Sequence, residues 1–199
     1  MNLFCIKYFL IVFLSVLVVK TAFSQRTVDG RQLTEHSGNT YVKGENSPFT
    51  GIAIVLFANN QKQVETLFEN GKQQGVETTW YPDGKIMQQI TYKDGLFEGS
   101  YKTFYENGNP EQEKIYRKGM MNGPSTHYYN DGTKQNEGEY SDCREIGVWT
   151  FYHPNGKIMK QGTFREGFEE GIWKFWNEQG QPEKEVIFKS GEVVSEKKF

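Results

Sequence analysis

Histidine, cysteine and paired acids are the side chains of this sequence that could bind a metal or catalyse a reaction. The three histidines, His36, His127 and His153, show none of the short spacings that zinc ligands share. No column of histidines and no acidic partner accompanies Cys143, and the acids at 169–170 adjoin a turn, as solvated carboxylates do. We therefore expect no catalytic residue, no metal and no cofactor, and we interpret the protein as a non-enzyme.

The segments that carry these residues repeat with a fixed period of 24 residues. An aromatic residue recurs at one place in every repeat, and three sets of glycines keep the same period. A fixed period of this length marks a repeat array, so most of the chain forms one elongated domain. The sets are Gly51, Gly75, Gly99, Gly123, Gly147 and Gly171; Gly84, Gly108, Gly132, Gly156 and Gly180; Gly71, Gly95, Gly119, Gly167 and Gly191, with Cys143 in the vacant place; and Phe68, Tyr92, Tyr116, Tyr140, Phe164 and Phe188.

Each repeat has the composition of a β-hairpin. Aromatic and β-branched residues at 148–152 favour a strand, and residues 157–164 favour the strand that returns. Between them, Asn155-Gly156 predicts a tight turn, because both residues accept a positive φ. A second turn at 165–167 leads into the next repeat. The sequence therefore predicts an all-β fold, an elongated antiparallel sheet of stacked β-hairpins.

The chain divides into four segments on this reading. Residues 1–24 are expected to be a signal peptide, 25–50 a degenerate N-terminal cap, 51–194 six repeats of 24 residues, and 195–199 a C-terminal tail. The first segment has one basic residue before an uncharged run at 8–19, and the small residues Ala22 and Ser24 then precede Gln25. The alternative is a membrane anchor, but twelve helical residues span only about 18 Å.

Export and charge limit the classes of partner. Cleavage between Ser24 and Gln25 would place the mature protein in the periplasm or outside the cell. It would leave Cys143 as the one cysteine, which excludes an internal disulfide. The formal net charge is −2 for the whole chain. Removing the two lysines of residues 1–24 makes it −4, which argues against nucleic acid and against peripheral contact with anionic membranes.

The repeat then resembles a known family. The pattern G-x-W-x-x-Y-x-x-N-G-K, followed by an aromatic residue and two glycines, resembles the MORN-repeat family, in particular its bacterial variant form. The residues that fill the pattern are Gly147, Trp149, Tyr152, Asn155, Gly156, Lys157, Phe164, Gly167 and Gly171. The resemblance implies a twisted sheet that acts as a binding or assembly surface and carries an antitoxin-like label. Phospholipid binding, proposed for the wider family, conflicts with the acidic mature chain.

The aromatic columns indicate which face could bind a partner. Large residues fill two columns in every repeat, the Phe68 column and the column Leu56, Trp80, Phe104, Tyr128, Tyr152 and Trp176, so we interpret both as a packed ladder. Strand alternation places the residues two and four after each main glycine on the face opposite that second column. The candidate partner-binding residues lie in those varying positions: Tyr101, Trp149, Phe151, Trp173 and Phe175. The alternative is that they form a second small core under a loop or a neighbouring protomer.

Three functions fit this surface. We expect an exported, non-enzymatic scaffold that binds a protein, and a homodimer is left open. The alternative is a carbohydrate or cell-wall binding module, because similar hairpin arrays stack exposed aromatic rings on sugars. The third is an antitoxin proper, which the export signal would restrict to an exported toxin.

Overall fold

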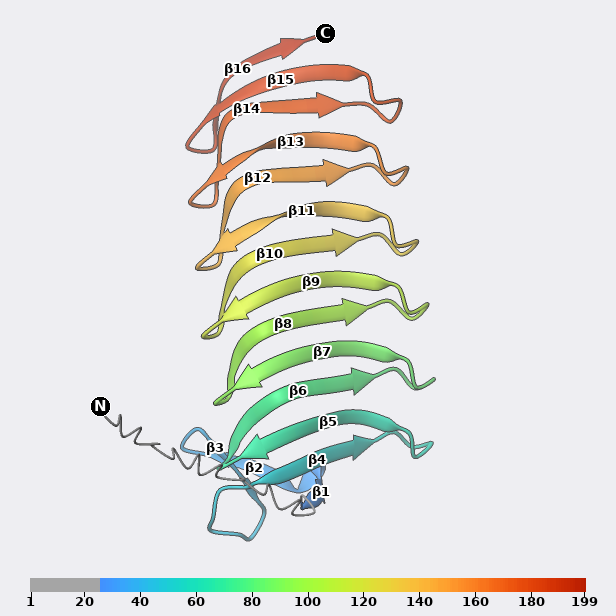
Figure 1. The fold of residues 1–199 in the computed structure, drawn as a ribbon, viewed down its shortest axis with the longest axis vertical. Helices are drawn as coiled ribbons and strands as arrows, with labels where there is room; N and C mark the ends of the chain where they lie inside the picture. Colours follow the sequence, from blue (N-terminus) through green and yellow to red (C-terminus); the bar gives the residue numbers. More distant parts are fainter. Residues whose placement is uncertain (1–25) are drawn as a thin grey trace, which may run out of the picture.

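The computed structural model describes residues 26–199, so the expected signal peptide lies outside the described residues. As predicted, these residues form an all-β repeat array, with one short 3-10 turn (Figure 1). A sheet of 14 strands has the order β1-β4-β5 and then runs consecutively to β16, while β2 pairs with β3 in a second sheet. The elements are β1 Thr27–Asp29, η1 Gly30–Gln32, β2 Leu33–His36, β3 Asn39–Val42, β4 Gly51–Leu56, β5 Lys62–Glu69, β6 Lys72–Trp80, β7 Ile86–Lys93, β8 Leu96–Phe104, β9 Pro110–Arg117, β10 Met120–Tyr128, β11 Lys134–Ser141, β12 Arg144–Tyr152, β13 Ile158–Arg165, β14 Phe168–Trp176, β15 Pro182–Lys189 and β16 Glu192–Lys198.

Consecutive hairpins build the long sheet. Every neighbouring pair from β4 to β16 is antiparallel, and only β1 adds to the edge strand β4 in parallel. With about 4.8 Å between strands, the stack is roughly 60 Å long. The final strand reaches Lys198, so most of the residues expected as a tail, 195–199, extend the array instead.

The two ends of each hairpin carry different turns. At the longer loop, Gly156 N–H donates to the His153 carbonyl, and Gly156 has φ 79° while Asn155 keeps a negative φ. This is a type I turn closed by a glycine bulge, so the expectation that both residues take a positive φ is wrong there. At the shorter turn, both Glu166 (φ 53°) and Gly167 (φ 85°) are left-handed. The two-residue turn of the predicted kind therefore lies at the other end of the hairpin.

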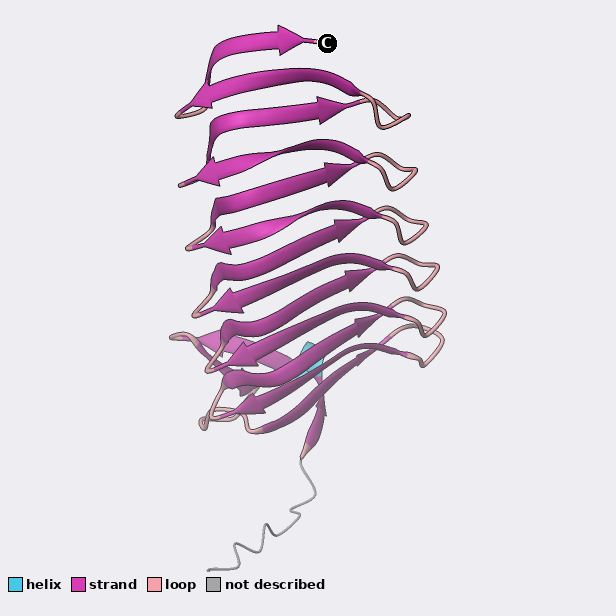
Figure 2. Ribbon diagram, turned by 45° about the horizontal axis from the view of Figure 1, so that its top comes forward, coloured by secondary structure: helices cyan, strands magenta, loops and turns pink. Residues whose placement is uncertain are grey.

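The first glycine of each repeat bends its strand. Gly147 and Gly171 have φ values of 67° and 73°. Next to Gly171 the pairing of β13 with β14 skips from Gln161 to Thr163, which marks a β-bulge. Figure 2 shows the resulting bend near the start of the strands that follow the two-residue turns. This explains why the first glycine column is complete in every repeat.

A column of side chains ties each long loop to the next repeat. The hydroxyls of Tyr81, Tyr105 and Tyr129 donate to the carbonyls of Phe104, Tyr128 and Tyr152 at 2.7–2.8 Å. His153 continues the column, with Nε2 2.9 Å from the Trp176 carbonyl oxygen. Because each bond joins residues 23 apart, it fixes the spacing between hairpins. His153 is thus a structural residue of the loop column.

The N-terminal segment packs on one face of the first hairpin. Phe49 is fully buried against Phe68, with ring centroids 5.7 Å apart, and Val42 and Ala53 complete the cluster. The Phe49 carbonyl accepts the Gly71 N–H, so the cap also joins the two-residue turn. We call the face that carries Ala53 and Phe68 the cap face, and the opposite face the open face.

Candidate partner-binding face

Two indoles form the core of the C-terminal cap face. Trp149 is 4% exposed and Trp173 is 0% exposed. Each indole lies over a glycine of the preceding strand: a Cβ at Gly138 would stand 2.2 Å from Trp149 Cδ2, and one at Gly162 would stand 2.1 Å from Trp173 Cδ2. Each Nε1 donates to a backbone carbonyl, of Glu139 and Thr163, at 3.3 Å. The structure therefore corrects the expectation that these indoles face a partner.

The Phe68 column lies on the same face as the indoles. Phe164 pairs with Gly147, two residues from Trp149, and alternation places all three positions on the cap face. Ring contacts follow: Phe164 meets Trp173 edge-on at 5.0 Å and Trp149 at 5.9 Å, while Phe188 meets Trp173 at 6.1 Å. Grouping this column with the Tyr152 column as one ladder was wrong, because similar size does not place two columns on one face.

Two of the predicted residues keep an accessible part. Phe151 and Phe175 are half-buried, and each ring has a lysine above it. The ammonium of Lys160 lies 4.4 Å from the Phe151 centroid and 5.0 Å from the Trp173 centroid, while Lys184 lies 5.0 Å from the Phe175 centroid. This region therefore presents half-buried ring edges beneath two cations. We call Phe151, Lys160, Phe175 and Lys184 the lysine–aromatic surface.

Tyr101 belongs to a separate aromatic group nearer the cap. Its ring lies 6.3 Å from Phe97 and 5.7 Å from Tyr116, and its hydroxyl bonds to the Gln88 amide at 2.9 Å. One repeat on, Ser125 occupies the equivalent place and is buried. The small serine divides the aromatic face, so the structure brings Trp149, Phe151 and Trp173 together but not Tyr101.

A polar strip fills the division between the two groups. Lys114 is half-buried, and burial lowers the pKa of its ammonium. Burial, and secondly the charge of Lys114, lowers the pKa of His127, whose Nε2 lies 2.8 Å from the Gln112 amide nitrogen. An amide N–H donated to the imidazole and the lowered pKa both favour the neutral form of His127. Sequence reasoning missed Lys114 because its column holds unrelated residues in other repeats, and it missed Gln112 because the amides of that column occur in only three repeats.

Comparison with known families identifies the array. A model of the MORN repeat variant matches residues 73–94, 97–118, 121–142, 145–166 and 169–190, which is 110 of the 199 residues. The chain belongs to this family. The five matches coincide with the five hairpins from β6-β7 to β14-β15, so the MORN-variant repeat is one hairpin. The sixth expected repeat, β4-β5, keeps the fold but is not matched. No curated protein matches the chain closely enough to be reported as a relative.

Metal-ligating side chains stay apart in the described part of the MORN-variant array. Between residues 26 and 199, no group of three or more metal-ligating side chains comes together. Cys143 is exposed at the two-residue turn, with φ 65°. No helix in that range is long and apolar enough to cross a bilayer.

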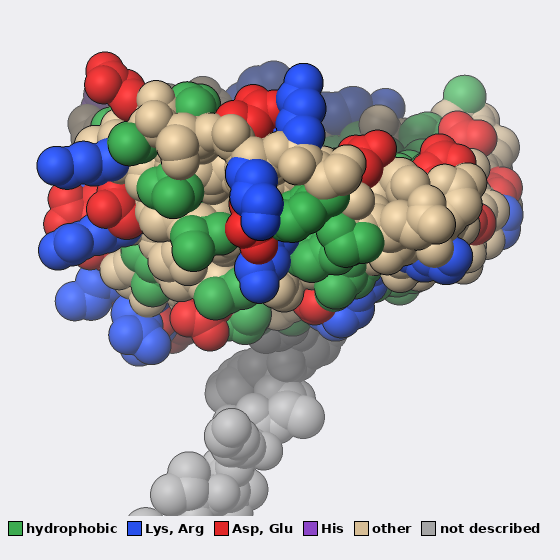
Figure 3. All heavy atoms as spheres, turned by 90° about the horizontal axis from the view of Figure 1, so that it is seen from above, with side chains coloured by type: hydrophobic (Ala, Val, Ile, Leu, Met, Phe, Trp, Pro, Cys, Tyr) green, Lys and Arg blue, Asp and Glu red, His purple; other side chains and the backbone are tan. Residues whose placement is uncertain are grey.

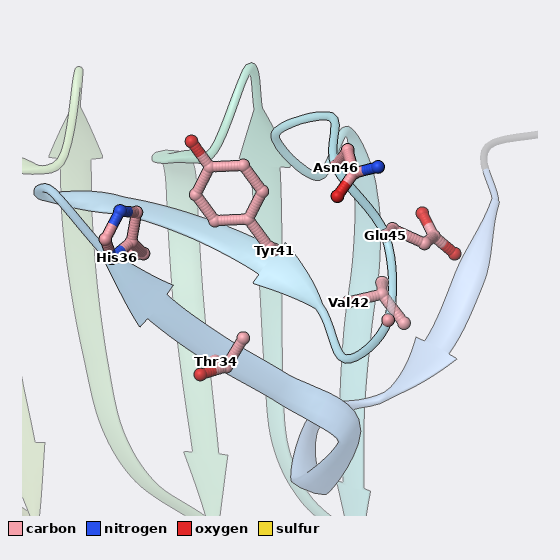
Figure 4. A pocket seen from close by; sticks show the side chains of 7 residues that line it. Thr34, His36, Tyr41, Val42, Glu45 and Asn46 are labelled. Carbon is pink, nitrogen blue, oxygen red and sulfur yellow. The ribbon is translucent and has the colours of Figure 1, made fainter.

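A shallow hollow of about 280 Å³ lies on the cap hairpin (Figure 4). His36 and Thr34 reach it from β2 and Tyr41 from β3, while Glu45 adjoins it from the following loop. The Glu45 carboxylate is already paired with Arg26, whose Nη1 donates to it at 2.8 Å. This hollow therefore offers one histidine and no free acid, which is too little for acid–base chemistry or for a metal.

Proposed function

We propose that the protein is a non-enzymatic, exported scaffold that binds another protein through its cap face. One observation carries the proposal: the cap covers the first hairpin, whereas the lysine–aromatic surface far from the cap keeps half-buried rings beneath two lysines, which have only the loosely placed carboxylates of Glu169 and Glu196 nearby, at 4.0 and 3.6 Å. Membership of a repeat family with an open sheet supports a scaffold. The proposed partner supplies apolar groups to the ring edges and carboxylates that approach Lys160 and Lys184 more closely than Glu169 and Glu196 do.

The positions of the lysines favour a protein over a carbohydrate as the partner. Sugars stack on the flat faces of exposed aromatic rings, but here the ammonium groups of Lys160 and Lys184 lie over those faces. Both indoles that would stack best are buried. Carbohydrate binding stays the second candidate, because the amides Gln88, Gln112 and Asn136 follow one another along the cap face. Retention on insoluble polysaccharide would favour it.

Charge reversal tests the protein-binding proposal. We expect the variant Lys160→Glu with Lys184→Glu to fold, because both heads lie above the sheet, and to lose partners captured by the wild type from an envelope fraction. Lys189→Glu is the matched control, because that exposed lysine lies on the open face. Equal capture by all three proteins would show that the partner does not use the lysine–aromatic surface.

Export rests on the sequence of residues 1–24. We expect the mature protein to begin at Gln25 and to lie in the periplasm or outside the cell. N-terminal sequencing that returned Met1 from a soluble cytosolic pool would refute export. An antitoxin role would then need no exported toxin, and a cytosolic partner would become the target of the search.

A further inference from the structure

The strand β16 forms the C-terminal edge of the long sheet, and no strand within residues 26–199 pairs with its outer side. All of its residues are exposed. At the opposite edge, β1 adds to β4, and Ile52 N–H donates to the Arg26 carbonyl at 2.8 Å. Figure 3 views the array from the C-terminal end, where basic and acidic side chains both reach the surface. The sheet therefore has one covered edge and one open edge.

The pairing with β15 determines which backbone groups of β16 point outwards. Phe199 N–H donates to the Glu183 carbonyl at 3.0 Å, and Lys197 lies two residues earlier in the same register. Successive residues of an antiparallel strand direct their backbone groups to opposite sides, so the N–H and C=O groups of Glu196 and Lys198 point away from β15. These two residues therefore offer two donors and two acceptors to a further strand.

The side chains of the same two residues adjoin the lysine–aromatic surface. Lys198 lies opposite Lys184 and Glu196 lies opposite Val186, so both side chains are on the cap face. The Glu196 carboxylate is 3.6 Å from Lys184 Nζ and 3.9 Å from Lys198 Nζ. Both distances exceed the roughly 2.7–2.9 Å of a charge-assisted hydrogen bond. Two ammonium groups thus share one loosely placed carboxylate, which leaves an excess of positive charge beside the open edge.

We propose that the partner adds an extended acidic segment to β16 as a further strand and places a carboxylate beside Lys198 and Lys184. This inference rests on the proposed function, because the added strand continues the lysine–aromatic surface. In strand addition, main-chain hydrogen bonds supply affinity and alternate side chains supply specificity. Charges on an edge strand discourage unselective pairing, so Glu196, Lys197 and Lys198 restrict this edge to a strand of complementary charge.

Charge disfavours a second copy of this chain as the source of that strand. Two registers would align the outward groups of Glu196 and Lys198 with those of another β16. One register places Glu196 opposite Glu196, and the other places Lys197 opposite Lys197. Like charges directly opposite each other on neighbouring strands are destabilising. The acidic segment therefore belongs to a different protein.

Peptide binding to the mature chain is the first test. The probe is a peptide of about eight residues, with blocked ends, in which glutamate and valine alternate, so that a strand carries all its carboxylates on one face. We expect this peptide to bind, and a lysine–valine peptide of the same length to bind at least ~10-fold more weakly. Binding of neither peptide, or equal binding of both, overturns the proposal.

Two variants at one position separate the backbone from the side chain. Glu196→Pro removes an outward N–H that the fold does not use, so the variant should fold but bind the glutamate–valine peptide ~10-fold or more weakly. Glu196→Ala is the matched control. It keeps the N–H and should bind at least as tightly as the wild type, because Lys184 and Lys198 lose their shared carboxylate. Equal binding by the two variants contradicts strand addition.

Amide hydrogen exchange of the wild type tests the proposal without any variant. The glutamate–valine peptide should slow exchange at Glu196 and Lys198, whereas the amide of Lys197, which faces β15, should change little. Slowed exchange elsewhere, but not at these two amides, overturns the proposal. If both amides are protected without peptide and the mature chain sediments as a dimer, a second copy occupies the edge and the proposal is wrong.

The variants also distinguish this inference from the proposed function. If Glu196→Pro loses the peptide while Lys160→Glu with Lys184→Glu still captures every partner, the edge is a binding site and the lysine–aromatic surface is not. If charge reversal abolishes capture while Glu196→Pro binds the peptide as Glu196→Ala does, the surface binds the partner and strand addition is wrong.

Discussion

The indole of Trp173 lies over the backbone of Gly162, where a Cβ would be 2.1 Å from Cδ2 and 2.4 Å from Cγ. Trp149 and Gly138 repeat the arrangement one repeat earlier. Gly138 and Gly162 are two of the three glycines in the described residues that do not take a positive φ. They are needed for space and not for backbone freedom. The large residue and the missing side chain therefore form one packing unit.

This packing unit predicts energetic coupling. Gly162→Ala should destabilise the protein by about 1–3 kcal/mol, because the methyl would displace the indole. Trp173→Ala alone should cost about 3–5 kcal/mol. In the double variant the collision is gone, so the combined loss should fall short of the sum by about 1 kcal/mol or more. Urea denaturation of the four proteins measures this coupling, and strict additivity would contradict the packing.

Removal of the two buried indoles should destabilise the fold itself, and not only weaken the binding of a partner. We expect Trp149→Ala with Trp173→Ala to lower the melting temperature sharply and to reduce the β-sheet circular dichroism signal. Removal of both rings leaves Phe151 and Phe164 without their main ring contacts. An unchanged melting temperature would indicate that both tryptophans lie at the surface, as the sequence alone suggested.

The longer loop requires a left-handed residue at Gly156. Gly156→Val should cost more than about 1 kcal/mol, because a β-branched residue is strained at a φ of 79°. Gly156→Asn is the matched control and should cost less, because asparagine tolerates this conformation. Thermal denaturation of both variants measures the difference. Equal losses would indicate that bulk, and not φ, is the constraint.

The sequence predicted the repeat and the hairpins because each follows from a strict period and from local turn chemistry. The loop column Tyr81, Tyr105, Tyr129 and His153 kept the same period and could have been found. The column is hard to recognise in the sequence because histidine takes the place of tyrosine at 153.

The distribution of side chains between the two faces could not be predicted in the same way. Pairing across a hairpin places Phe164 on the face of Trp149, and this depends on the bulges that shift register. The burial of Trp149 depends on Gly138, eleven residues earlier, a position that holds Lys114 in the preceding repeat. The cap does not follow the 24-residue period. The only residue that pointed to its contact with the first hairpin was therefore the aromatic Phe49.

Cys143, which takes the place of glycine in the third glycine column, should lower the stability of the protein. Cys143 is held at φ 65° at the turn position that glycine occupies in the other repeats, and Asp142 before it is left-handed as well. Cys143→Gly should raise stability by about 1 kcal/mol, because the Cβ of an L-residue is strained there. Cys143→Val should lower it. If glycine proved destabilising, the contact between the Cys143 sulfur and the Met121 N–H, at 3.3 Å, would be the stronger effect.

Alkaline pH should destabilise the array through its half-buried tyrosines. Burial, followed by the charge of Glu145, raises the pKa of Tyr140 to about 12, and burial is likewise the main cause that raises the pKa of Tyr152 to about 12. An unfolded tyrosine has a pKa of about 10. The folded state therefore keeps protons that the unfolded state releases, so this stabilisation is complete below about pH 10 and is lost as pH rises towards 12. The denaturant concentration at the midpoint of unfolding should fall over that pH range. It should fall less steeply for the variant Tyr140→Phe. If the tyrosinate absorbance of the folded protein rose in full near pH 10, neither pKa would be raised and the prediction would fail.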